Sequence, residues 1–471
     1  MVHARLHAVF LRWIVAIAVA GVGSVLMAGA ASATTAEDGV GSSGVGDPYF
    51  PHAGNGGYDV AHYDLAITYD LKTHMLSGKA TITATATQRL TRFNLDLVSW
   101  MRVTELTVDG VNAAQSQVYR ELRISPASEL ADGQTFTVVV GYRGPARRPR
   151  DVTGSLFGWI RTDDGAFVAN ECDGAPTWFP SNDHPTDKAT YDIGITVPAG
   201  KTAVSNGTLI SSTTVGGWTT WQWHEPDEMA TYLATATVGD FDITTSTGPD
   251  GLPILNAVDR DIPPDVGEVL TYIPPMITYF SSLFGPYPFS SAGAIIDDNG
   301  RVGYALETQT RPLFSGHPTE GTLAHELSHQ WFGDAVSPQQ WDEIWLNEGF
   351  ATAATVFWKE HTGGPTAEDE FDRLYKLPAD DPFWRLPPGA PGVQDMFDDR
   401  VYRRGFMTLE ALRLKVGDAA FFTILRQWVA IHDDGDASTL DFISLAEDVS
   451  GLQLDDFFDA WLYTPTKPED W

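Results

Sequence analysis

The hydrophobic pattern of this chain changes its period near residue 243, and this change limits the folds that the chain can adopt. From Tyr58 to Ile243, apolar and polar residues alternate, or β-branched residues gather, in short runs separated by Gly, Asp and Pro turns. The runs are 62–70, 79–87, 93–97, 135–142, 191–197, 202–210, 218–223 and 230–243. Many short strands without long helices predict an antiparallel β domain over residues 58–243.

The remaining residues, 244–471, mostly show the period of helices. Helical spacing covers 264–283, although Pro274 and Pro275 must break or kink it. Residues 302–310 have the pattern of an extended strand. Helical patterns then recur near 319–333, 343–361, 401–416, 418–432, 438–449 and 454–462. We therefore expect an α+β protein in which a mainly helical domain follows the β domain.

The amino-terminal residues 1–33 have the features of a signal peptide. Two arginines form a basic start, Trp13 to Ala30 is almost entirely apolar, and Ala31-Ser32-Ala33 fits a cleavage site. The apolar run is long enough to span a bilayer, so an uncleaved anchor is the alternative. The Gly- and Ser-rich residues 34–57 predict a flexible tether. We expect a secreted protein with no stable membrane anchor after cleavage.

The acidic composition restricts the partners of the chain. Asp and Glu number 62 against 30 Lys and Arg, which gives a formal net charge of −32. Such a surface repels phosphate backbones, so we expect no binding to nucleic acid. Cys172 is the only cysteine, so the chain has no internal disulfide and must be stabilised by its core. We also expect a monomer.

The most informative chemical pattern lies in residues 322–334. His325-Glu326-x-x-His329 is the H-E-x-x-H pattern of zinc hydrolases. Residues four apart lie on one helix face, so both imidazoles can point at one metal ion. Glu326 projects about 100° around the helix from His325, which places it as a base and not as a ligand of the same ion. By itself, such a short pattern also occurs by chance.

A catalytic zinc needs a third protein ligand and an open position for water. Trp345-Leu-Asn-Glu348-Gly-Phe-Ala supplies a carboxylate after eighteen intervening residues, which leave room for a loop and a returning helix. The apolar flank of Glu348 indicates burial, and burying an unpaired charge is costly. Glu348 is therefore the candidate third ligand of one Zn²⁺ ion, and a Glu on a helix surface is the alternative.

These motifs resemble those of the aminopeptidase N family of gluzincins. The resemblance rests on H-E-x-x-H, the eighteen-residue spacing, Asn-Glu348-Gly-Phe-Ala and Gln330-Trp-Phe-Gly-Asp334. It covers nearly the whole mature chain and implies a thermolysin-like catalytic domain over residues 244–471. It also implies a zinc-dependent aminopeptidase that acts on peptides with a free amino terminus, with Glu326 as the general base.

Two further segments are similar to parts of that family. Gly303-Tyr304-Ala305-Leu306-Glu307-Thr308 corresponds to its Gly-Ala-Met-Glu-Asn strand, with Tyr304 and Thr308 in place of the usual Gly and Asn. Trp178 to Tyr191 is similar to its Phe-Pro-Cys-x-Asp-x-Pro…Lys-Ala-Thr-Phe segment. The resemblance implies that Glu307 and Glu171 bind the substrate ammonium and that the strand pairs with the peptide backbone.

Val401-Tyr402-Arg403-Arg404-Gly405 is similar to the Tyr-x-Lys-Gly stretch of the family. The resemblance implies that Tyr402 donates a hydrogen bond to the oxyanion, while a core or surface Tyr is the alternative. Thr355 stands where the family usually has a Glu supporting the metal site, so we expect a changed zinc affinity or ligand orientation. No helical carboxyl-terminal domain follows in this sequence, which predicts a more open cleft.

Three alternatives to an aminopeptidase remain at this point. A gluzincin endopeptidase would need neither Glu307 nor Glu171. An epoxide-hydrolase side activity, as in the related leukotriene hydrolase, has no positive sign in the sequence. A non-enzymatic binding protein on the same scaffold is disfavoured by the complete set of His325, Glu326, His329, Glu348 and Tyr402. The sequence does not reveal which amino-terminal side chain is preferred.

Overall fold

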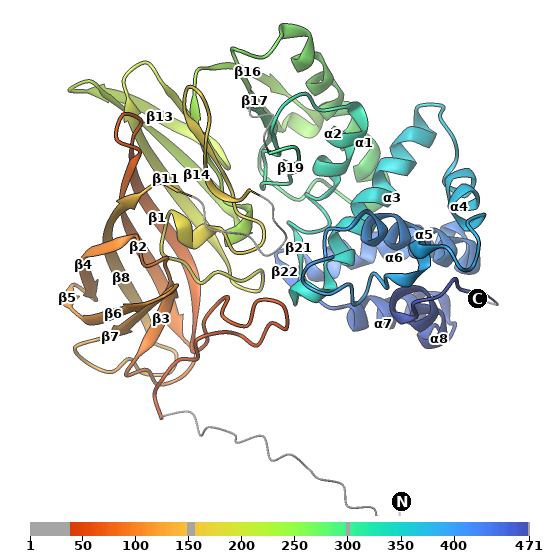
Figure 1. Cartoon of the computed structure of the whole chain (residues 1–471), viewed down its shortest axis with the longest axis horizontal. Coiled ribbons are helices and arrows are strands. Elements are labelled where there is room, and N and C mark those ends of the chain that lie inside the picture. Colours follow the sequence, from red (N-terminus) through yellow and green to blue (C-terminus); the bar gives the residue numbers. More distant parts are fainter. Residues whose placement is uncertain (1–37, 148–155, 298–301, 470–471) are drawn as a thin grey trace, which may run out of the picture. The chain divides into compact units, whose positions relative to one another are not determined.

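The computed structural model describes residues 38–147, 156–297 and 302–469 (Figure 1). The predicted signal peptide, its cleavage site and residues 34–37 lie outside these ranges. None of the helices in the described ranges is long and apolar enough to cross a membrane.

A sheet of eight strands forms the centre of the amino-terminal part that the structure describes. Buried and more exposed side chains alternate along its strands, as the sequence pattern predicts for a sheet with one face on a core. Its order is β13 (Thr208–Val215), β14 (Trp218–Ala230), β11 (Lys188–Pro198), β1 (Tyr58–Asp70), β2 (Met75–Ala86), β8 (Thr135–Pro145), β4 (Arg102–Val108) and β5 (Val111–Asn112).

The pairings of this sheet are antiparallel, as predicted, except that β1 and β11 run parallel. The alternation of side chains is the same in both directions, so the pattern alone does not reveal the parallel pair. Two smaller sheets complete the domain, with the orders β12 (Thr202–Ser205), β15 (Ala236–Gly239), β10 (Ala166–Ala169), β9 (Gly158–Arg161) and β3 (Phe93–Asp96), β7 (Glu121–Ser125), β6 (Ala114–Val118).

The carboxyl-terminal part begins with a second mixed sheet, in which β16 crosses the domain boundary predicted at residue 243. Its order is β16 (Phe241–Thr247), β17 (Pro253–Asp259), β18 (Ala292–Ile296), β20 (Leu313–Phe314) and β19 (Ala305–Leu306). β16 looks like part of the first domain in sequence, but it pairs along its length with β17. A short parallel pair joins β21 (Val336–Pro338) to β22 (Gly435–Ala437).

Helices make up most of the carboxyl-terminal part (Figure 1). They are α1 (Ile273–Phe284), α2 (Glu320–Ser328), α3 (Trp345–His361), α4 (Ala367–Tyr375), α5 (Asp399–Val416), α6 (Asp418–His432), α7 (Thr439–Ser450) and α8 (Asp455–Phe458). The predicted break of the helix over 264–283 is confirmed, because Pro264–Tyr272 forms a 3₁₀ helix and α1 starts at Ile273, with the two prolines in its first turn, where a missing N–H costs nothing. The α+β prediction with a helical second domain is confirmed.

The prediction of a flexible tether over residues 34–57 is wrong for residues 38–57. Val40 forms a β-bridge with Arg92, and the side chain of Asp47 is buried. The glycines of this segment allow a packed loop to turn, because five of them have a positive φ, namely Gly39, Gly44, Gly46, Gly54 and Gly57. The glycines that make this segment look like a linker therefore supply the positive-φ conformations that its packed structure needs.

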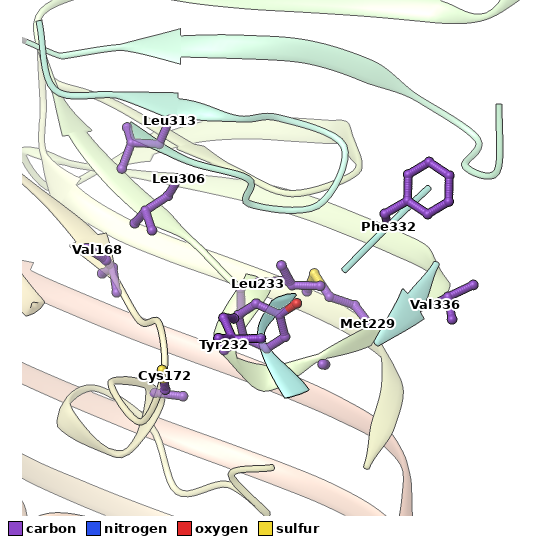
Figure 2. Packing of buried hydrophobic residues seen from close by; sticks show 14 of the residues in the cluster. Val168, Cys172, Met229, Tyr232, Leu233, Leu306, Leu313, Phe332 and Val336 are labelled. Atoms are coloured by element: carbon purple, nitrogen blue, oxygen red, sulfur yellow. The ribbon is translucent and has the colours of Figure 1, made fainter. Parts of the chain in front are cut away.

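One hydrophobic cluster joins the β domain to the helical domain. Figure 2 shows Met229, Tyr232 and Leu233 of the first domain in the same cluster as residues of the second, among them Phe332 and Val336. Beside this cluster, the ammonium of Lys188 on β11 donates 2.8 Å hydrogen bonds to the backbone carbonyls of Asp334 and Ala335. The two domains are thus held together at the segment that directly follows the H-E-x-x-H motif.

Candidate active site

The H-E-x-x-H motif occupies the end of α2 and the turn that follows it. The hydroxyl of Thr319 caps the helix by accepting from the N–H of Thr322 at 3.0 Å. α2 ends at Ser328, earlier than the predicted residue 333, and His329 is its C-cap residue. The N–H of Trp331 bonds the carbonyl of Ser328, which tightens the turn in the manner of a 3₁₀ helix.

The three predicted zinc ligands converge in the structure. His325 Nε2 lies 3.1 Å from Glu348 Oε2 and 3.2 Å from His329 Nε2, and the third distance, His329 Nε2 to Glu348 Oε2, is 3.5 Å. Ligands about 2.05 Å from a tetrahedral zinc ion are separated by about 3.3 Å. The three atoms therefore have the spacing of one face of a zinc coordination shell. In the described ranges, no other group of three His, Cys, Asp or Glu brings its ligand atoms within 4.8 Å of one another.

Hydrogen bonds on the far side of the rings orient the two histidines. His329 Nδ1 lies 2.9 Å from the carbonyl of Phe332, so Nδ1 carries the proton and Nε2 offers its lone pair to a metal. His325 hydrogen-bonds the backbone of Ala351. The hydroxyl of Thr355, which stands where the family usually has a Glu, donates to the carbonyl of Ala351 at 2.9 Å. The backbone carbonyl of Ala351 therefore orients His325.

The charge state of Glu348 suits a ligand. Burial alone would raise its pKa, but the adjacent imidazoles of His325 and His329 lower it to about 2. Burial dominates at Glu326, where it raises the carboxyl pKa well above its usual range. Glu326 lies on the same cavity but makes none of the short contacts to the two imidazoles that Glu348 makes.

A contact between two glycines sets the distance between α3 and α5. A Cβ atom on Gly349 would lie 2.9 Å from the Cα of Gly405, and one on Gly405 would lie 2.7 Å from the Cα of Gly349. Gly349 follows Glu348, and Gly405 lies one helical turn after Tyr402. The close approach therefore brings Tyr402 to the metal site, where its ring stacks on His325 at 5.8 Å between ring centres.

Gln330 holds the strand β19 segment against the zinc-binding turn. Its side chain donates to the carbonyl of Glu307 at 3.0 Å and to Asp334 at 2.7 Å, and accepts from the N–H of Thr310 at 2.7 Å. The predicted strand over 302–310 is reduced to Ala305–Leu306, because only these two residues pair with β20. β19 is the edge of its sheet, so one side of this strand carries no β partner among the described residues.

Glu171 and Glu307 bring two buried carboxylates to the same cavity. Oε1 of each has no hydrogen-bond partner within the described residues. Burial raises the pKa of Glu171, and its neighbour Glu307 adds to this effect. The pKa of Glu307 is also raised, mainly by burial. Buried acceptors without partners are rare in proteins, so these two oxygens are suited to a ligand with hydrogen-bond donors and a positive charge.

The cavity that these residues surround has a volume of about 420 Å³. Of the ten residues predicted for the site, nine line it; Gly303 does not, although its φ of +76° shows why a glycine stands before the strand. Sequence reasoning missed the apolar part of the wall. The lining residues outside the prediction are Phe50, Phe157, Cys172, Asp173, Leu306, Met396 and Phe397.

Two histidines and a glutamate at this spacing, with the carboxyl group of Glu326 on the same cavity, define a zinc-dependent hydrolase site of the gluzincin type. Two family models match the chain. The model of the "Peptidase family M1 domain" matches residues 305–461, and the model of the "Peptidase M1 N-terminal domain" matches residues 60–233. This chain belongs to peptidase family M1. Zinc is accordingly its cofactor, as the sequence predicts.

Solved structures and curated relatives agree with this assignment. The M1 zinc metallopeptidase of Deinococcus radiodurans has a TM-score of 0.83 and 30% identity, covering 90% of this chain and 98% of that one. Aminopeptidase M1-B of Oryza sativa subsp. japonica is 26% identical over 439 residues, and Tricorn protease-interacting factor F2 of Thermoplasma acidophilum is 26% identical over 345 residues. The alignments cover 85% and 65% of this chain but 49% and 42% of those proteins.

The glycine contact leads to a testable prediction. Gly405→Ala should push α5 away from α3, cost about 1–3 kcal/mol of unfolding free energy by overpacking, and lower kcat by displacing Tyr402. Thermal unfolding and steady-state kinetics measure the two effects. Gly321→Ala is the matched control, because a Cβ in that first turn of α2 meets no atom closer than 3.6 Å. Equal behaviour of the two variants would contradict the role of the contact.

Proposed function

We propose that this protein is a zinc aminopeptidase that removes amino-terminal residues from peptides. The observation that carries the proposal is the pair of buried, unpartnered carboxylate oxygens of Glu171 and Glu307 in the cavity of the zinc ligands. An α-ammonium offers these oxygens both donors and positive charge. An internal peptide nitrogen carries no charge, so an endopeptidase substrate would leave the two carboxylates uncompensated.

Similar proteins support this choice. Aminopeptidase M1-B and the glutamyl aminopeptidase of Bos taurus are among the relatives, the latter 27% identical over 348 residues. A mutant of the Deinococcus radiodurans enzyme has been solved with a Tyr-Ser-Ala substrate bound, at a TM-score of 0.83. These facts concern those proteins, and together with the two carboxylates they favour a peptide with a free amino end as the substrate here.

The chemistry assigns a task to each side chain. When bound, zinc polarises the scissile carbonyl and lowers the pKa of a coordinated water towards about 7. Glu326 takes the proton of the attacking water and passes it to the leaving amine. Burial, and then the charge of Glu348, raises the pKa of Tyr402 well above its usual value, so its hydroxyl stays protonated. That hydroxyl donates to the developing oxyanion.

The edge strand β19 provides a binding site for the substrate backbone. Tyr304 and Ala305 lie on the cavity, and the strand ends at Leu306, next to Glu307. A peptide that adds to this edge as a further strand would place its first residue against the two carboxylates. Backbone pairing is independent of side chains, so it suits an enzyme that acts on many peptides.

The proposed substrate class is tested with fluorogenic aminoacyl amides and their N-acetylated forms. We expect the zinc-loaded protein to cleave the free-amine substrates and to cleave the acetylated forms at least 100-fold more slowly, because acetylation removes the charge that Glu171 and Glu307 compensate (~2.7 kcal/mol for a factor of 100). A chelator should abolish both activities. Equal cleavage of the two sets would favour an endopeptidase.

The role of Glu326 is tested by Glu326→Gln. The amide cannot accept the proton of water, so kcat should fall by about 10²- to 10⁴-fold while the zinc content by elemental analysis stays near one ion per chain. Glu368→Gln, on the exposed surface of α4, is the control and should keep full activity. Substantial residual turnover in Glu326→Gln would refute its role as the base.

We also propose that the mature enzyme is an exported monomer. The proposal is supported by the basic start, the apolar run from Trp13 to Ala30 and the Ala31-Ser32-Ala33 site of the sequence. Mass spectrometry of the protein from the culture medium should give an amino terminus near Thr34, and light scattering should give the mass of one chain. An intact Met1 in the membrane fraction would contradict export.

A further inference from the structure

Residues 42–56 form a closed loop at the amino-terminal end of the described chain. The N–H of Gly56 donates to the carbonyl of Ser42 at 3.1 Å, so the ends of the loop meet. Loops of this length whose ends are close often carry function. The segment packs tightly, because a Cβ on Gly44 would lie 2.4 Å from the carbonyl oxygen of Pro51. Its conformation is therefore tightly constrained.

Asp47 fixes the tip of this loop. Its Oδ1 accepts from the N–H groups of Tyr49 and Phe50 at 2.8 and 2.7 Å. Its Oδ2 accepts from the N–H of Trp341 at 2.7 Å and lies 3.4 Å from Nε2 of His184. Burial alone would raise the pKa of Asp47, but the hydrogen bonds it accepts, the largest from His184, lower it. One carboxylate thus orients Tyr49 and Phe50 and joins the loop to both domains.

Further hydrogen bonds attach the loop to each of the two domains. Asn55 donates from its backbone N–H to the side chain of Asn182 at 2.6 Å, and from its amide to Asp96 at 3.0 Å, both in the β domain. The hydroxyl of Tyr49 accepts from the N–H of Gly392 at 2.6 Å in the helical domain. Gly392 lies four residues before Met396, which lines the active-site cavity.

Phe50 brings the loop into the active site. Its ring lines the cavity and meets Trp341 edge-on at 6.1 Å between ring centres. The other apolar and aromatic side chains of this part of the wall are those of Phe157, Tyr304, Leu306, Met396 and Phe397. Among the described lining residues, Asp173 is the charged one without a task in the proposed reaction, and it forms an ion pair with Arg120 at 3.1 Å. Apart from the carboxylates that the proposed reaction uses, the described lining therefore offers no free carboxylate to a basic side chain.

We propose that Phe50 is a specificity-determining residue that contacts the first side chain of the substrate. This inference rests on the proposed aminopeptidase function. The first side chain is attached to the carbon that bears the ammonium, so it lies in the same cavity as Glu171 and Glu307. With its apolar wall, the enzyme prefers amino-terminal residues with large apolar or aromatic side chains, such as Phe and Leu, over Ala and Arg.

The test compares Phe50→Ala with the wild type on phenylalanyl, leucyl, arginyl and alanyl fluorogenic substrates. The variant should lose about tenfold in kcat/KM for the phenylalanyl and leucyl substrates, mainly through a higher KM, and stay within twofold for the alanyl substrate. Phe50→Leu, which keeps an apolar side chain, should retain most of the preference. Phe383→Ala is the matched control, because Phe383 is equally half-buried but does not line the cavity.

Other outcomes overturn the inference. An equal loss of kcat/KM on all four substrates would show a structural role. An unchanged ratio of kcat/KM between the phenylalanyl and alanyl substrates, or a preference of the wild type for the arginyl substrate, would show that Phe50 does not contact the first side chain. If thermal unfolding shows that Phe50→Ala is not folded, Phe50→Leu replaces it in the test. Its ratio of kcat/KM between the phenylalanyl and leucyl substrates must then be lower than that of the wild type. Calorimetric binding of free L-phenylalanine and L-alanine, which have no amide bond to cleave, to zinc-loaded protein gives the same comparison without turnover, so a failure of the proposed function is seen separately.

Discussion

Four glutamates surround one cavity, and their mutual repulsion is the constraint on which the site depends. Glu348 is compensated by two imidazoles, whereas buried oxygens of Glu171 and Glu307 have no hydrogen-bond partner among the described residues. Such a cluster is costly to bury unless cations enter it. A divalent metal beside Glu348 and an ammonium between Glu171 and Glu307 are the cations that this geometry admits. In the proposed function, the electrostatic strain of the free site is therefore a source of selectivity for a free amino end.

The surrounding fold keeps these charges in place through a few close contacts. The glycine pair of α3 and α5 sets the position of Tyr402, and Gln330 ties the strand of Glu307 to the zinc-binding turn. Lys188 joins the β domain to the same turn, so that Glu171, which comes from the β domain, faces ligands from the helical domain. The site is shared by both domains, and a catalytic domain without the β domain would lack half of the amine site.

The sequence predicts the metal site well because its chemistry depends on spacing along helices and on one loop. Resemblance to a family also predicts Glu307, Glu171 and Tyr402, which the structure brings to the same cavity. The role of residues 38–57 cannot be predicted in the same way, because glycines that bend a packed loop and glycines of a linker look alike. Phe50 thus stays hidden until the tertiary fold brings it to the cavity. α4 is missed because it is short, although Thr366 and Asp369 form the capping box that marks its start.

The most direct test is a crystal structure of the zinc-loaded protein with a free L-amino acid bound, with anomalous data at the zinc edge. The account predicts one anomalous peak about 2.1 Å from Nε2 of His325, Nε2 of His329 and a carboxylate oxygen of Glu348. It also predicts that the α-ammonium lies within hydrogen-bond distance of both Glu171 and Glu307. A zinc ion at these ligands with the ammonium turned away from the two carboxylates would contradict the account.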